Sequence, residues 1–103
     1  MDKIAYLSAK DLVSEIKSKS ISSVELTELY INRIEEYDEA INAVVIRTFD
    51  QALEDAKKVD IALAKDEDLG PLHGLPMTIK ESYVITDTPA TWGNEAFKEN
   101  LGL

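Results

Sequence analysis

Hydrophobic residues in the first two thirds of the chain recur every three or four positions, which is the spacing of one face of an α-helix. Three such stripes predict helices over residues 9–19, 23–38 and 49–65. The residues expected to face a core are Leu12, Val13 and Ile16 in the first helix, Leu26, Leu29, Tyr30, Ile34 and Tyr37 in the second, and Phe49, Ala52, Leu53, Ala56, Val59 and Leu63 in the third. The first two thirds of the chain are therefore predicted to be helical.

A polar residue that can cap a helix precedes each stripe. Ser22 is followed three places later by Glu25, the spacing of a capping box, in which each side chain accepts the other residue's backbone N–H. Ile21 and Leu26 flank the same start at the spacing of a hydrophobic staple. The pairs Ser8–Asp11 and Thr48–Gln51 have the capping-box spacing as well. These signals predict where each helix begins.

Two short segments favour strands instead. Residues 42–47 hold a run of β-branched residues. In residues 75–81 the apolar side chains Leu75, Met77 and Ile79 alternate with other positions, which is the period of a strand with one apolar face. Pro76 has no N–H to donate to a neighbouring strand, so it should lie at the first residues of this strand or on a sheet edge.

Charge and composition exclude several classes of function. The chain has 103 residues, 45% of them hydrophobic, and a net charge of -9, so phosphate backbones and anionic lipid surfaces should be repelled. We therefore expect no nucleic-acid or membrane partner, and a cytoplasmic location is the default because no signal peptide is recognisable. The acidic run over residues 35–39 is interpreted as a solvated helix end. Cysteine is absent and histidine occurs once, so neither a metal site nor a cofactor is expected.

The residues by themselves leave the chemistry open. All four glycines and all three prolines lie in residues 70–103, where backbone geometry is therefore specified most tightly. By pattern alone, Lys80 is most simply a solvated charge, and His73 beside Gly74 is a loop residue that bonds the backbone. Six of the seven serines lie in the first 23 residues, where helix caps and helix surfaces explain them. The polar loop containing Trp92 and Asn94 could line a site.

The segment Gly70-Pro71-Leu72-His73-Gly74-Leu75-Pro76-Met77-Thr78-Ile79-Lys80-Glu81 resembles the part of amidase signature enzymes that carries their catalytic lysine. The order of the upstream helices and the turn Pro89-Ala90-Thr91-Trp92-Gly93-Asn94 are similar to the same family. The resemblance implies an α/β fold in which N-terminal helices precede the first strands of a mixed sheet. Residues 1–103 would then form the N-terminal part of an amidase domain.

The resemblance also implies the role of Lys80. In this family a lysine and two serines form a Ser-cis-Ser-Lys triad, in which the lysine activates a bridging serine and that serine activates the nucleophile. The substrate is a small-molecule amide, which is hydrolysed through an acyl-enzyme. Burial of the lysine amine would disfavour its charged form. Both serines come from a Gly/Ser-rich segment beyond the lysine that this chain does not contain, so we expect the chain alone to be inactive.

Two alternatives remain beside an amide hydrolase. The chain could instead belong to the amidase subunit of a tRNA-dependent amidotransferase, which is a member of the same family. A different class of function is a non-catalytic helical module whose acidic face binds a basic partner. We also expect self-association or a homo-oligomer, because strands without neighbours leave backbone groups unpaired.

Overall fold

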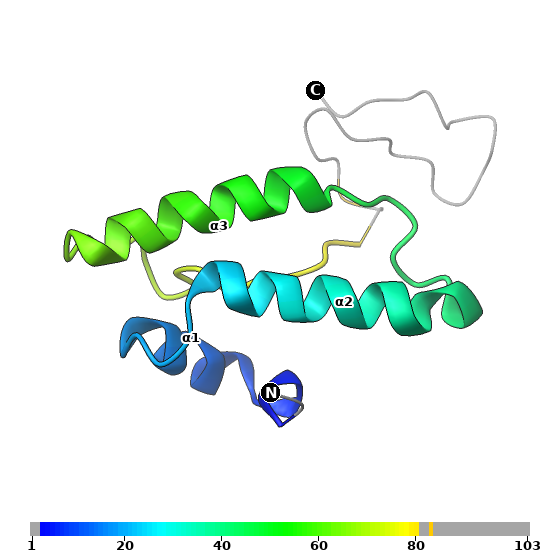
Figure 1. The fold of residues 1–103 in the computed structure, drawn as a ribbon, viewed down its shortest axis with the longest axis horizontal. Helices are drawn as coiled ribbons and strands as arrows, with labels where there is room; N and C mark the ends of the chain where they lie inside the picture. Colours follow the sequence, from blue (N-terminus) through cyan, green and yellow to red (C-terminus); the bar gives the residue numbers. More distant parts are fainter. Residues whose placement is uncertain (1–2, 81–82, 84–103) are drawn as a thin grey trace. The chain divides into compact units, whose positions relative to one another are not determined.

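The computed structural model describes residues 3–80 and 83 (Figure 1). Within these residues it contains a short 3-10 helix, η1 (Ile4–Tyr6), and three α-helices: α1 (Ala9–Lys17), α2 (Ser23–Ile41) and α3 (Phe49–Ala64). The two long helices, α2 and α3, lie side by side. All four helices belong to one compact unit, formed by the chain up to Ala43 together with Arg47–Pro76. Residues 44–46 and the chain from Met77 onward form a second unit.

The first two predicted helix caps are confirmed. The Ser8 hydroxyl accepts the backbone N–H of Asp11 at 3.1 Å. At the start of α2 both halves of the capping box are present: Ser22 Oγ accepts the Glu25 N–H at 3.0 Å, and Glu25 Oε1 accepts the Ser22 N–H at 3.1 Å. These bonds satisfy backbone donors that have no partner inside the helix.

The third predicted cap is wrong. Thr48 makes no side-chain bond to the start of α3, and its φ of -118° and ψ of 46° lie outside the extended region that an N-cap usually adopts. Its hydroxyl is therefore not directed at the free N–H groups of the first turn. Gln51, expected to reach back to the cap, instead donates to Asp55 one turn further along α3 at 2.9 Å.

All three α-helices are followed by a residue in the left-handed conformation that is not glycine, and after α2 this residue is Asn42, with a φ of 57°. Lys19, after α1, has a φ of 65°, and Asp66, after α3, has a φ of 59°. Behind α1, the N–H of Ser20 bonds the Glu15 carbonyl at 3.0 Å, and behind α3 the Glu67 N–H bonds the Ala62 carbonyl at 2.9 Å. These bonds satisfy carbonyls left free at each helix end, as in a Schellman motif. Glycine, the usual residue at such helix ends, is absent from all three. Helix α1 ends at Lys17, two residues before the predicted end at residue 19.

The core of the first unit gathers residues from every one of its helices. Its buried centre consists of Leu12, Ile16, Ile21 and Leu26, and the partly buried side chains packed against it are Ile4, Tyr30, Leu63 and Leu75. Burial of both Ile21 and Leu26 confirms the predicted staple. Leu75 brings the segment before Lys80 into contact with this core. The end of the predicted apolar stripe on α2 does not reach it, because Tyr37 is 51% exposed.

The acidic run over residues 35–39 is solvated except at Asp38. The side chains of Glu35, Glu36 and Glu39 are exposed, but Asp38 is only 5% exposed. Its carboxylate accepts the Ala43 N–H at 2.8 Å and pairs with the Arg47 guanidinium at 3.3 Å. The buried carboxylate thus stabilises the turn that follows α2. A count of charges along the sequence does not reveal this role.

The predicted strands over 42–47 and 75–81 are not formed in the described part of the chain. Residues 42–47 connect α2 to α3 and begin with Asn42 in the left-handed conformation (φ 57°). Residues 75–80 carry no regular secondary structure, and Glu81 lies outside the described residues. A strand exists only as part of a hydrogen-bonded ladder, and residues 3–80 and 83 contain none. The alternation of apolar residues therefore did not secure a strand: Leu75 packs on the core, but Met77 and Ile79 are exposed.

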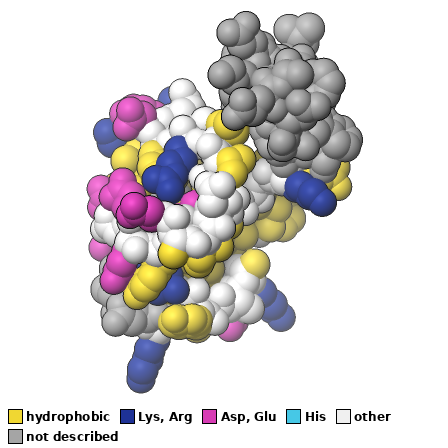
Figure 2. All heavy atoms as spheres, turned by 90° about the vertical axis from the view of Figure 1, so that its right-hand side faces the viewer, with side chains coloured by type: hydrophobic (Ala, Val, Ile, Leu, Met, Phe, Trp, Pro, Cys, Tyr) yellow, Lys and Arg dark blue, Asp and Glu magenta, His cyan; other side chains and the backbone are white. Residues whose placement is uncertain are grey.

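Large hydrophobic side chains also lie at the surface, where Figure 2 shows them among acidic and basic ones. On the first unit the most exposed aliphatic side chains include Ile41, Ile61, Leu69 and Leu72. In the second unit Val45, Met77 and Ile79 are exposed as well. Scattered apolar residues are normal on protein surfaces, and each of the two units has some.

Candidate active site

Lys80 closes the continuous described stretch and is exposed. Its backbone carbonyl accepts the N–H of Tyr83 at 3.0 Å. Within residues 3–80 and 83 the Lys80 amine has no hydrogen bond or ion pair. The burial expected for a catalytic amine is therefore not provided by the described residues. Trp92 and Asn94, from the loop that the sequence suggested could line a site, lie outside the described residues.

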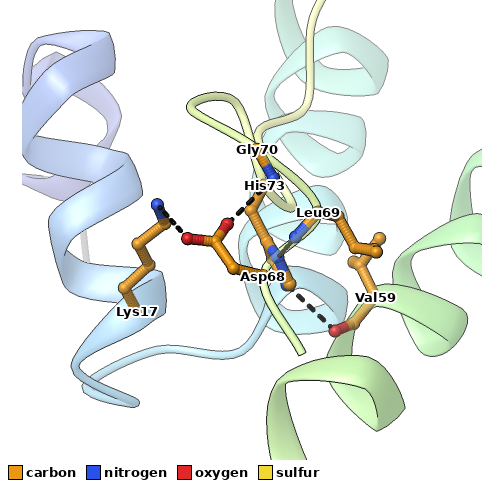
Figure 3. A network of polar contacts seen from close by, with 6 residues as sticks. All are labelled: Lys17, Val59, Asp68, Leu69, Gly70 and His73. Atoms are coloured by element: carbon orange, nitrogen blue, oxygen red, sulfur yellow. Dashed lines mark hydrogen bonds and ion pairs between the residues drawn. The ribbon is translucent and has the colours of Figure 1, made fainter. Parts of the chain in front are cut away.

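His73, seven residues before Lys80, is buried, with 3% of its surface exposed. Its Nδ1 lies 3.1 Å from the backbone nitrogen of Leu69, and its Nε2 lies 3.1 Å from the Val59 carbonyl oxygen of α3 (Figure 3). A backbone N–H can only donate and a carbonyl can only accept, so Nδ1 is bare and Nε2 carries the hydrogen. Both ring nitrogens of this neutral imidazole are occupied. The interpretation of His73 as a backbone-bonding loop residue is confirmed.

Gly74 is held against the start of α2. Its carbonyl accepts the hydroxyl of Ser23 at 2.7 Å, and its φ of 75° is one that other residues rarely adopt. A Cβ atom at this position would lie 3.2 Å from the Cβ of Ser23 and 3.3 Å from Cγ2 of Ile16. The backbone angle therefore favours glycine here, and a Cβ would also make close contact with Ser23 and Ile16. The buried Ser23 hydroxyl is committed to this bond, which makes it a structural group.

Substitution of Gly74 tests this close approach. We expect Gly74→Ala to lower the free energy of unfolding by about 2–3 kcal/mol, from roughly 1–2 kcal/mol of left-handed strain and about 1 kcal/mol of overpacking. Gly70→Ala is the matched control, because Gly70 also has a positive φ, of 116°, but a Cβ there would meet nothing within 4 Å. Urea unfolding of both variants gives the comparison. A loss at Gly74 no larger than the roughly 1–2 kcal/mol of left-handed strain would show that the contact with Ser23 and Ile16 carries no cost.

Asp60 of α3 also bonds the start of α2, where Ser23 contacts Gly74. Its two carboxylate oxygens accept the backbone N–H groups of Ser23 at 2.7 Å and Val24 at 3.0 Å. A carboxylate at a helix N-terminus satisfies free donors and complements the helix dipole. Asp60 is 37 residues from Ser23 in the sequence, and no local pattern connects the two.

Asp68 ties the loop before His73 to α1. Its carboxylate accepts the Gly70 N–H at 2.8 Å and lies 3.5 Å from the Lys17 amine (Figure 3). The Gly70 hydrogen bond, followed by the charge of Lys17, lowers the pKa of Asp68 from its ordinary value of 3.8. A lowered pKa means that the ionised carboxylate favours the folded loop above pH 3.8 and that this contribution is lost as the pH falls through the lowered pKa.

Two other features of the described residues, a serine–lysine spacing on α1 and an open groove, are not part of a catalytic arrangement with Lys80. Ser14 and Lys17 have an S-x-x-K spacing on α1, but both are exposed and the Lys17 amine pairs with Asp68. An open groove on η1 and α2, where Arg33 stacks between the rings of Tyr6 and Tyr37 at 5.1 and 5.4 Å, does not include the lysine segment. Among these residues no group of three or more candidate ligands could hold a metal ion, and no helix is long and apolar enough to cross a membrane.

Known proteins resemble the chain along most of its length. The sequence profile of the family described as Amidase matches residues 25–102. A glutamyl-tRNA(Gln) amidotransferase chain of Moorella thermoacetica is 47% identical over 75% of this chain and 16% of its own length. Acylamidase of Rhodococcus erythropolis is 32% identical over 93% of this chain and 20% of its own, and fatty-acid amide hydrolase 2-A of Danio rerio is 37% identical over 87% and 18%. The chain thus spans about a fifth, or less, of the length of these relatives.

Proposed function

This chain belongs to the amidase family, and on that premise we propose that it supplies the catalytic lysine of an enzyme that hydrolyses carboxylic amides. The observation that carries the proposal is the family match over residues 25–102, which includes the complete lysine segment from Gly70 to Glu81. Relatives named acylamidase and fatty-acid amide hydrolase support an amide as the substrate class.

In the proposed mechanism Lys80 is the base of a triad whose other two members are serines outside these 103 residues. The lysine amine takes a proton from the bridging serine, which takes one from the nucleophilic serine as that serine attacks the amide carbonyl. The proton returns from Lys80 through the bridging serine to the substrate nitrogen, which leaves as ammonia or an amine while the acyl-enzyme forms. Water, losing a proton by the same route, then attacks the acyl group, and the acid is released as the nucleophilic serine recovers its proton. This role needs a neutral amine, and an exposed lysine is charged near neutral pH. We propose that residues covering Lys80 in the complete site disfavour that charge.

We further propose that residues 75–81 become a strand of a mixed sheet in the complete α/β domain. The alternation of Leu75, Met77 and Ile79 supports this. So does the exposure of Met77 and Ile79, since apolar side chains on one strand face are normally buried by a second layer. We also propose that the chain self-associates when it is produced alone, because a segment that pairs as a strand only in the complete domain leaves backbone groups unpaired. We propose a cytoplasmic location for the protein as well.

A second candidate is the amidase component of a tRNA-dependent amidotransferase. The 47% identity to the glutamyl-tRNA(Gln) amidotransferase chain of Moorella thermoacetica, and 41% to that of Thermobifida fusca, favour it. Transfer of an amide nitrogen to glutamyl-tRNA(Gln), in place of simple release into water, would distinguish this activity from the first. The third alternative, a non-catalytic acidic module, has less support because Asp38 of the acidic run is committed to the chain's own Ala43 and Arg47.

The function is tested by comparing two proteins in one assay. A protein in which this sequence continues through a Gly/Ser-rich segment should hydrolyse carboxamides, and added hydroxylamine should capture its acyl group as a hydroxamate. The 103-residue chain by itself should do neither, because the acyl-accepting serine is outside it. Amide hydrolysis with no hydroxamate formed would contradict the acyl-enzyme. Activity of the 103-residue chain alone would contradict the assignment of the serines to a later segment.

A further inference from the structure

His73 is committed to two backbone groups from different parts of the fold. Its imidazole joins the Val59 carbonyl of α3 to the Leu69 N–H of the following loop, and it is almost fully buried. We propose that His73 is a positioning residue for Lys80: its neutral imidazole, hydrogenated at Nε2, fixes the point from which the lysine segment leaves the helical unit. This inference rests on the proposed role of Lys80 as the catalytic base.

The two bonds explain why a histidine suits this position. The side chain must accept from Leu69 at one atom and donate to Val59 at another, with both atoms in one rigid ring. Longer polar side chains could reach the same groups only by giving up more rotamer freedom. Within the described residues no buried side-chain nitrogen or oxygen lacks a partner. We call the two hydrogen bonds of His73, to Leu69 and to Val59, the His73 clamp.

The restraint continues along the backbone toward the lysine. Directly after His73, the Gly74 carbonyl is bonded to Ser23, and the Leu75 N–H bonds the Leu72 carbonyl at 3.0 Å while its side chain packs on the core. Pro76 then restricts the chain through its fixed φ. Lys80 follows Leu75 by five residues, which span at most about 18 Å when fully extended. The two bonds of His73 therefore help to fix the end of the first unit, from which the lysine segment continues.

The tautomer is tested directly on the 103-residue chain. His73 is its only histidine, so labelling histidine with nitrogen-15 gives the signals of a single ring. At neutral pH the couplings between ring protons and ring nitrogens should show hydrogen on Nε2 and none on Nδ1. A ring with hydrogen on Nδ1, or one that exchanges between both tautomers as a free imidazole does, would overturn the clamp.

The positioning role is tested in the amide hydrolase that contains this sequence. Asparagine at position 73 can still accept from Leu69, glutamine can still donate to Val59, and alanine can do neither. We expect His73→Ala to lower kcat by about 10²-fold with little change in KM, because misplacing a catalytic group by about 1 Å has that effect. His73→Asn and His73→Gln should each recover part of the loss. Circular dichroism of the helices measures the folded fraction of each variant, and each kcat is then expressed per folded molecule.

Two outcomes separate the failure of this inference from that of the proposed function. If His73→Ala keeps the wild-type kcat per folded molecule while Lys80→Ala is inactive, the histidine is only structural and the inference is overturned. If Lys80→Ala keeps its kcat, the proposed function itself fails, whatever tautomer His73 adopts.

Discussion

Replacing Lys80 by alanine in the amide hydrolase that contains this sequence should lower kcat by about 10²–10⁴-fold, the contribution typical of a positioned general base. The reason is that the serines would lose the amine that receives their proton. The helical first unit should keep its fold, because the Lys80 side chain bonds no residue in the described part of the chain. Steady-state hydrolysis of a carboxamide, with circular dichroism of the helices, measures both parts of this prediction.

Two further lysine variants control for charge and for general surface effects. Lys80→Arg keeps the positive charge but cannot give up its proton, so it should be about as inactive as the alanine variant. Lys58→Ala removes an exposed lysine from α3 and should leave kcat unchanged. An arginine variant with substantial activity would mean that the charge of Lys80 matters and its basicity does not. A Lys80→Ala enzyme that retains most of its kcat would remove Lys80 from the mechanism.

Ile16→Ala should lower the free energy of unfolding by about 3–5 kcal/mol, near the upper end of the range for a buried isoleucine. Ile16 is 0% exposed and lies at the centre of the core cluster. Its Cγ2 also faces Gly74, so the cavity would open between α1 and the segment that leads to Lys80. Because two helices and a loop meet there, collapse into the space should be limited. Urea unfolding followed by circular dichroism measures the loss.

Ile61→Ala is the matched control for this core substitution. It makes the same chemical change inside a helix, but Ile61 is 56% exposed. We expect a change within about 0.5 kcal/mol, since surface substitutions are usually small and alanine favours the helix. If both variants lost the same stability, the cluster around Ile16 would not be the stabilising core of the first unit.

The start of α2 shows how much of the site the sequence could reveal. The Ser22–Glu25 capping box and the Ile21–Leu26 staple depend on residues within five positions of each other, and both were predicted correctly. The bonds from Asp60 to the same helix start were not predicted, because 37 and 36 residues separate the partners. A local pattern carries no information about a contact that only the packing of α3 against α2 creates.

In the later part of the chain, too, some features follow from the sequence and others only from the tertiary structure. The sequence by itself determined the helical periods, the two serine caps, the role of His73 as a loop residue that bonds the backbone and, through resemblance, the family. The catalytic role of Lys80 stays a prediction. Only the tertiary structure decided that His73 bonds Val59 and Leu69, that Gly74 rests against Ser23, and that Asp38 is buried. The physical reason is range. Caps and helical periods are set by neighbours along the chain, whereas buried polar bonds and close packing need partners that folding brings together from distant positions.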